Sequence, residues 1–326
     1  MKASAKGAGK EGGKPRSTRR PLLEDGFLSN MVIDHALEMA ERIGARAVFV
    51  SAELVPQLRA LDASKRPFDI YLVTQDADRL VPPDVEACKL LKVPNIPVGR
   101  VDKIKVAMVM AASRSLLKAG DRVVCVSGLP EANVLDSIVV VQVGTETEVM
   151  TTAEIGDFAR RMKAGVFDTV LELALELAKE GREGKPVGTI FVIGDTKGLK
   201  EHVRQMVLNP FKGYTEKERQ ILDPSVRNTI KEFSTIDGAF VIDPNGIVQS
   251  AGSYLSALAV AGDLPPGLGA RHQAAASITA AVPGAIAIAV SESTGEVRVF
   301  RHGLTVSEIE PGTYGPAPAE AEPSTG

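Results

Sequence analysis

The 326-residue chain contains no tryptophan, only 2 cysteines, and only 4% aromatic residues. Cys88 and Cys125 both lie in apolar stretches, and we interpret them as buried thiols of a protein from a reducing compartment. No apolar run approaches the roughly 20 residues of a membrane span, and no apolar segment follows the N-terminal lysines as in a secretory signal. These absences favour a cytoplasmic protein with no membrane partner.

An excess of charge of one sign is also missing. The 38 Lys and Arg residues nearly balance the 41 Asp and Glu residues, which leaves a formal net charge of −3. This balance argues against bulk nucleic-acid binding. With 44% hydrophobic and 24% charged residues, the composition is typical of a globular protein, and the length suffices for two domains.

Composition divides the chain into four parts. Residues 1–20 are rich in Gly, Lys, Ser and Arg and predict a disordered basic tail, which we interpret as solubilising because no aromatic residue is interleaved. Residues 311–326 are rich in Pro, Ala and Glu and predict a second disordered tail. Between the tails we expect one α/β domain over residues 21–150 and another over residues 151–310.

The first of these regions alternates helical and strand patterns. Such alternation predicts a mostly parallel sheet with helices on its faces. A continuous β-branched run at residues 138–143 suits a central strand. The helices are expected at residues 31–43 and 101–117, and the other strands at residues 47–50, 69–73 and 123–126.

Two segments of this region carry a resemblance to a known domain. The runs IGARAVFV at residues 43–50 and KAGDRVVCVSG at residues 118–128 resemble the C-terminal α/β domain of pyruvate kinase, and the similarity spans roughly residues 30 to 145. No counterpart of the kinase barrel is seen, so the resemblance implies no kinase active site. It implies a role in assembly or effector binding.

The second region predicts a mixed sheet surrounded by helices. Residues 167–181 form an amphipathic pattern, and the turn signals at residues 243–246 and 293–295 predict antiparallel connections. The other helices are expected at residues 153–164, 199–208, 224–233 and 274–281, and the strands at residues 188–193, 239–242, 247–250, 285–290 and 296–300.

Acidic and basic residues stand at the ends of these elements. Asp237-Gly238-Ala239 lies at the mouth of a strand, and Gly269-Ala270-Arg271-His272 opens a helix. A carboxylate can hold a metal or take a proton from a hydroxyl, and a helix N-terminus with an arginine can hold phosphates. Taken singly, these residues also fit an Asx turn, a surface charge and a packed histidine. Together they point to a nucleotidyl transferase without a P-loop or Rossmann motif.

The combination is similar to the diadenylate cyclase family over roughly residues 160 to 308. The order and spacing of the motifs agree with that family, and the pyruvate-kinase-like region before them is typical of its archaeal class. The matching pieces are GTIFVIGD at residues 188–195, DGA at 237–239, AGSYL at 251–255, GARH at 269–272, Ala275, VSE at 290–292 and TG at 294–295.

The resemblance implies that two ATP molecules condense to cyclic di-AMP and two pyrophosphates. Each 3′-hydroxyl would attack the α-phosphorus of the other ATP, so two domains would have to meet head to head in a dimer. Asp237 would activate the hydroxyl or help hold a metal, Mn²⁺ or Mg²⁺, and Glu292 would assist in holding it.

The resemblance also implies the remaining site residues. Arg271, His272 and Ser291 would bind phosphates, and Tyr254 and Leu255 would line the adenine pocket. Gly238 and Ala239 belong to the catalytic motif with Asp237. Further contacts with the substrate are expected from Gly194, Gly252, Gly269, Ala270 and Gln273.

Three positions depart from the family pattern. Gln273 stands where the family has the second arginine of Arg-His-Arg, Ala270 where it often has threonine, and Ser293 where it often has a second glutamate. The lost charge at Gln273 favours an alternative, a catalytically weak or inactive module that binds ATP or cyclic di-AMP. A third hypothesis is an assembly or effector protein led by the N-terminal domain.

Overall fold

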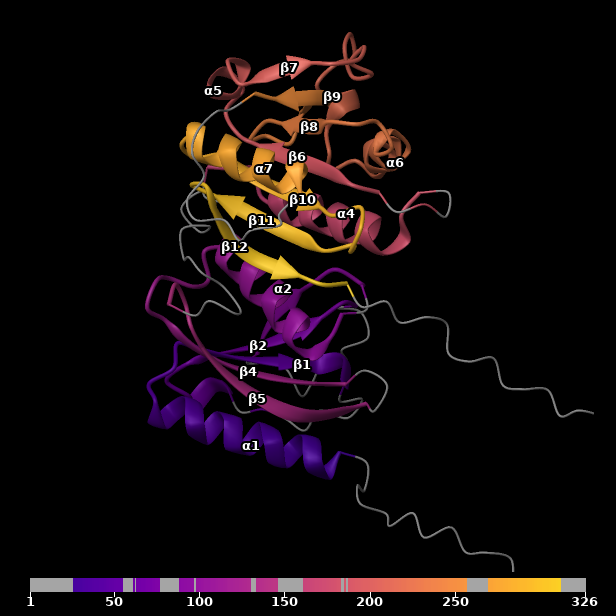
Figure 1. The fold of residues 1–326 in the computed structure, drawn as a ribbon. Coiled ribbons are helices and arrows are strands. Elements are labelled where there is room, and N and C mark those ends of the chain that lie inside the picture. Colours follow the sequence, from indigo (N-terminus) through magenta and orange to yellow (C-terminus); the bar gives the residue numbers. More distant parts are fainter. Residues whose placement is uncertain are drawn as a thin grey trace, which may run out of the picture.

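The computed structural model contains two β-sheets stacked along the long axis of the molecule (Figure 1). The strand orders are β3-β2-β1-β4-β5 and β12-β11-β10-β6-β8-β9-β7. The two predicted tails lie almost wholly outside the described residues. The structure describes residues 26–54, 61, 63–76, 88–96, 98–129, 133–145, 161–182, 185, 187–256 and 269–311.

The first sheet is mostly parallel, as predicted. Strands β1 to β4 pair in parallel, and β5 joins β4 in the antiparallel sense. The prediction of a central strand at residues 138–143 is wrong, because β5 forms an edge of the sheet. The elements are α1 (Phe27–Arg42), β1 (Ala47–Ser51), β2 (Asp69–Thr74), β3 (Lys89–Lys92), α2 (Arg100–Ser113), β4 (Arg122–Leu129) and β5 (Val134–Gln142), with 3-10 turns at Ala52–Leu54 and Ala63–Lys65.

Helices cover both faces of this sheet. Helix α1 buries Ile33, Ala36 and Ala40, whose spacing of three and four residues puts them on one stripe against the outer face. Helix α2 covers the opposite face, which is turned toward the second sheet (Figure 1). It ends at Ser113 rather than at residue 117, and Ser115 has a φ of +57° that no helix continues.

The second sheet is mixed, as predicted. Strand β8 pairs in parallel with β6, and the other neighbours are antiparallel. The elements are α4 (Val166–Glu180), β6 (Thr189–Ile193), α5 (Thr196–Lys200), β7 (Val203–Gln205), α6 (Pro224–Phe233), β8 (Ala239–Ile242), β9 (Val248–Leu255), α7 (Ala270–Ala281), β10 (Ile286–Val290), β11 (Val297–Arg301) and β12 (Leu304–Ile309), with a 3-10 turn at Lys217–Arg219.

Two helices expected here differ in the structure. The helix predicted at residues 199–208 is wrong, because α5 ends at Lys200 and residues 203–205 pair with β9 as strand β7. Most of the helix predicted at residues 153–164 lies outside the described residues, and residues 161–164 form turns and a bend rather than a helix.

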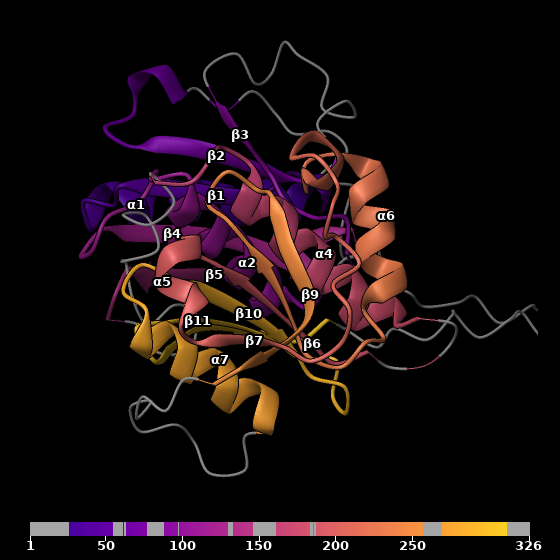
Figure 2. The ribbon, with the colours of Figure 1, turned by 90° about the horizontal axis from the view of Figure 1, so that it is seen from above.

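Alternating side chains divide the second sheet between two layers. Ile190 and Val192 pack under α7, whereas Phe191 and Ile193 pack against α4. The core on the α4 face continues through α2 into the first sheet, and α2 contacts β12. Viewed from above, α7 and α4 lie on different sides of β10 and β11 (Figure 2). In the part of the chain that the structure describes, no helix has the length and apolar character to traverse a membrane.

Candidate active site

Three chain segments meet at one edge of the second sheet. Strand register pairs Thr189 with Val290 and Ile190 with Ala239. Residues just before β6, just before β8 and just after β10 therefore lie at the same edge. This edge gathers Gly188, Asp237 and the Ser291-Glu292 pair.

Arg271 joins two of these segments from the first turn of α7. Its Nη1 donates to Glu292 Oε2 at 2.9 Å, and its Nη2 donates to Asp237 Oδ1 at 3.3 Å. Helix α7 begins after Gly269, and no side chain of the described residues caps its first N–H groups. The guanidinium and the positive end of the helix dipole thus lie together, an arrangement suited to binding an anion.

A pocket of about 730 Å³ opens around this arginine. Seven of the residues expected at the site line it: Asp237, Gly269, Ala270, Arg271, His272, Ser291 and Glu292. Val290 and Ser293 complete the lining. The pocket can therefore present an arginine, two carboxylates and two serine hydroxyls to one ligand.

The carboxylates of Asp237 and Glu292 are the pocket oxygens best suited to bind a cation. The Asp237 side chain is 81% exposed and that of Glu292 is 57% exposed, so neither is tied into the core. Among the described residues, no group of three or more His, Cys, Asp or Glu side chains could hold a metal ion. Two carboxylates fit a hard divalent cation whose remaining ligands are water and phosphate oxygens.

His272 is more buried than the other polar residues of the lining. Its ring is buried and packs 6.1 Å from the ring of Phe300 on β11. Its Nε2 has no hydrogen-bond partner among the described residues. Burial, and then the charges of Arg298 and Arg271, lower the pKa of His272 below its usual value. The imidazole is therefore neutral near pH 7 and can offer a hydrogen bond rather than a charge.

Ser291 and Glu292 stand on a tight turn between β10 and β11. Gly295 N donates to Ser291 O at 3.0 Å, and Ser291 N donates to Glu296 O at 2.9 Å. Thr294 N donates to Ser291 Oγ at 3.3 Å. These bonds close the turn on itself and fix the direction in which Glu292 leaves the sheet.

Close backbone contacts hold the Asp237 segment in place. Gly238 has a φ of +109°, and a Cβ there would lie 2.8 Å from Ser253 N on β9. Gly252 has a φ of +63°, and its Cβ would lie 2.5 Å from Val207 Cγ2. Both positions exclude a side chain, so Asp237 can stand directly beside β9.

The other predicted residues spread around this centre. Ala239 is buried at the start of β8, Leu255 packs under α7, and Tyr254 is exposed beside it on β9. Gln273 is exposed on α7 and does not line the pocket. Gly194 follows the far end of β6, where it packs against Leu199 and Ala285.

Gly188 is a site residue that sequence reasoning did not assign. A Cβ at this position would lie 2.6 Å from Arg271 Nη1 and 2.8 Å from Glu292 Cβ. Its φ lies outside the left-handed region, so the position needs glycine for space rather than for backbone freedom. The signals in the sequence are a glycine directly before an apolar strand and its place at the start of the GTIFVIGD motif at residues 188–195.

Replacing Gly188 by Ala is expected to lower turnover roughly 10- to 100-fold, because the new methyl group displaces Arg271 from the two carboxylates. The steady-state rate of product formation checks this. Gly99→Ala is the matched control, since a Cβ there makes only an ordinary 3.5 Å contact far from the pocket. Unchanged turnover in Gly188→Ala would show that Arg271 need not occupy this position.

Comparison with known families covers both halves of the chain. Residues 176–305 match the family described as DisA bacterial checkpoint controller nucleotide-binding. Residues 28–151 match the family described as probable sensor domain DacZ_P. The pocket residues all lie within the first match, whereas the resemblance of the N-terminal region to pyruvate kinase stays a prediction.

Two solved structures show low similarity to this chain. A DacA double mutant from Staphylococcus aureus is 22% identical, with a TM-score of 0.31 over 44% of this chain and 85% of that one. A hypothetical membrane spanning protein from Bacillus cereus is 20% identical, with a TM-score of 0.36 over 48% of this chain and 69% of that one. At these scores neither structure bears on the geometry of the site.

Two curated proteins are much more similar in sequence. The diadenylate cyclase of Methanocaldococcus jannaschii is 42% identical over 211 residues, which are 64% of this chain and 66% of that protein, just under two thirds of its length. The diadenylate cyclase of Haloferax volcanii is 39% identical over 214 residues, which are 65% of this chain and 77% of that protein. The chain therefore belongs to the diadenylate cyclase family of enzymes.

Proposed function

We propose that the chain condenses two ATP molecules into cyclic di-AMP and two pyrophosphates at the pocket around Arg271. The observation that carries the proposal is the fork of this arginine between Asp237 and Glu292 at the N-terminus of α7. The names of the two curated relatives, both diadenylate cyclases, support this activity.

Some pocket residues bind the phosphates, and Asp237 directs the attack of the 3′-hydroxyl. Arg271, the free N–H groups of α7 and Ser291 bind the phosphates of one ATP. Asp237 orients the 3′-hydroxyl of the other ATP or takes its proton. The new oxygen–phosphorus bond forms in line as the bond between the α- and β-phosphates breaks, and pyrophosphate leaves. Neutral His272 contributes a hydrogen bond to the phosphates.

The two exposed carboxylates also suit a divalent cation. Asp237 and Glu292 would hold Mn²⁺ or Mg²⁺ when ATP brings phosphate oxygens as further ligands. The ion would neutralise charge on the phosphates. Arg271 would then exchange its contacts with the carboxylates for contacts with the phosphates.

One pocket offers only half of a symmetric reaction, so we propose that two copies meet face to face. Exposed apolar side chains lie next to Gly252 and the Asp237 segment, and Leu208 is 96% exposed. Val207, which lies beside Gly252, and Tyr254, two residues after Gly252 on β9, are also exposed. These apolar side chains lie beside the Asp237 end of the pocket. A second copy that covered them would bring the two pockets, and so the two bound nucleotides, together.

The test is incubation of the full chain with ATP and either Mn²⁺ or Mg²⁺, followed by mass-resolved chromatography and sedimentation. Cyclic di-AMP is expected, together with a dimer that Leu208→Ser weakens. If the chain binds ATP but does not convert it with either metal, the proposed cyclase activity is refuted. It would favour the alternative of a nucleotide-binding regulatory module, for which Gln273 in place of the family's arginine is the specific observation.

A further inference from the structure

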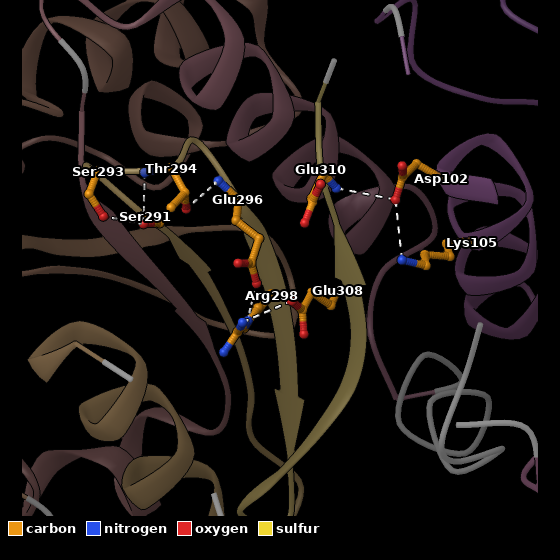
Figure 3. Close-up of polar contacts among 9 residues, drawn as sticks. All are labelled: Asp102, Lys105, Ser291, Ser293, Thr294, Glu296, Arg298, Glu308 and Glu310. Carbon is orange, nitrogen blue, oxygen red and sulfur yellow. Dashed lines mark hydrogen bonds and ion pairs between the residues drawn. The ribbon is translucent and has the colours of Figure 1, made fainter. Parts of the chain in front are cut away.

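Behind the pocket, three charged side chains form a cluster on one face of the second sheet (Figure 3). Arg298 on β11 is paired in register with Glu308 on β12, and Glu296 lies two residues before Arg298. The three therefore project from the same side. Since Val297 and Val299 face α4, this is the side that α7 covers.

Arg298 holds both carboxylates at once. Its Nε donates to Glu296 Oε1, and its Nη2 donates to Glu308 Oε1 at 2.9 Å. The arginine side chain is only 14% exposed, and Glu296 is buried. Burial raises the pKa of Glu296, so its ionised form depends on the arginine.

Glu296 is also the residue that closes the pocket turn. Its carbonyl oxygen accepts from Ser291 N, and its own N–H donates to Thr294 Oγ1 at 3.3 Å. On the other side of the turn, Glu292 receives the 2.9 Å bond from Arg271. A displacement of Glu296 would thus move the Ser291-Glu292 pair within the pocket.

Strand β12, which carries Glu308, is held in place by contacts with α2. Ile309 lies in the core shared with α2. Glu310 N donates to Asp102 Oδ1 of α2 at 3.2 Å, and Asp102 pairs with Lys105 at 3.3 Å (Figure 3). Glu308 therefore belongs to a strand that is held by the N-terminal half of the chain.

We propose that Arg298 is a positioning residue, which ties the 291–296 turn to β12 through Glu296 and Glu308 and so fixes Ser291 and Glu292 in the pocket. The proposal rests on the proposed function, since the position of Glu292 matters for turnover only if the pocket is the cyclase site. Arg298 itself does not line the pocket.

The test compares Arg298→Met with the double variant Glu296→Gln, Arg298→Met. The single variant is expected to lose at least about 10-fold in kcat and to melt at a lower temperature, because Glu296 is left buried without its cation. The double variant removes this buried charge, so its Tm is expected to recover. Its kcat is expected to stay low, because the tie to β12 is still missing.

Hydrogen exchange of the 291–296 turn supplies a readout that does not need turnover. Four amides of this turn are hydrogen-bonded, and both variants are expected to exchange them faster than the wild type. Lys231→Met is the control, since it breaks a 2.6 Å ion pair with Glu176 between α6 and α4, away from the pocket. This control is expected to change neither kcat nor exchange in the turn.

The results of these measurements distinguish a failure of the positioning role of Arg298 from a failure of the proposed cyclase function. If the double variant regains kcat and slow exchange together with its Tm, Arg298 only neutralises a buried charge and the proposal is overturned. If the wild type makes no cyclic di-AMP with either metal, the proposed function fails. Exchange in the turn then decides alone whether Arg298 positions it, with unchanged exchange in both variants counting against the proposal.

Discussion

Replacing Asp237 by Asn is expected to reduce cyclic di-AMP formation on the order of 10²- to 10⁴-fold, the range seen when a group that moves or orients a proton is lost. The amide keeps the shape of the side chain but can neither accept a proton nor bind a divalent cation as a carboxylate does. Because this side chain is 81% exposed and, within the part of the chain that the structure describes, is bonded only to Arg271, the fold is expected to remain stable. Rates measured at saturating ATP, with melting curves alongside, check both parts.

Asp195→Asn is the matched control for this change. Asp195 is also exposed, but it follows the opposite end of β6, where its Oδ2 accepts from Gly198 N and caps α5. Asparagine caps a helix as well as aspartate does, so full activity is expected. Equal turnover in Asp237→Asn and in this control would remove Asp237 from the mechanism.

Elements with clear boundary signals could be predicted from the sequence. Helix α6 spans residues 224–233 as expected, because Pro224 occupies its first turn and the Asp223 side chain accepts from Ser225 N. Strand β8 likewise matches its apolar run. In both cases local chemistry marks where the element begins.

Elements that depend on distant partners could not be predicted. Strand β7 is three residues long and exists because residues 203–205 pair with β9, about fifty positions away. The β-branched run in β5 is apolar enough for a central strand, but it forms an edge that α1 covers from one face. Propensity alone does not distinguish these environments.

Part of the candidate site could likewise be predicted from the sequence, and part could not. The motifs bearing Asp237 and Glu292 could be identified in the sequence, and they converge because β6 pairs with β8 in the parallel sense and with β10 in the antiparallel sense. Gly188 matters because the guanidinium of Arg271 comes within reach of it, and Arg298 matters because β12 places Glu308 opposite it. Such contacts form only in the folded chain, and the spacing of residues in the sequence does not predict them.

Replacing Arg271 by Lys is expected to lower kcat/KM for ATP by about 10²- to 10³-fold, the usual loss when one preorganised donor to a developing negative charge is removed. Lysine keeps the charge but cannot present two donors in a fixed fork. The ion pairs of Arg271 are partly exposed, and such pairs contribute about 1 kcal/mol or less to stability. The Tm is therefore expected to fall by less than about 4 °C.

Arg182→Lys provides the comparison that isolates the fork from the charge. Arg182 has a side chain as exposed as that of Arg271, 33% against 34%, and it pairs with Glu232 on α6 rather than with a pocket residue. The control is expected to match Arg271→Lys in Tm and the wild type in kcat/KM. If Arg271→Lys keeps its activity within about threefold, less than one kcal/mol of transition-state binding depends on the fork. Phosphate binding would then have to be assigned to the N–H groups of α7 and to Ser291.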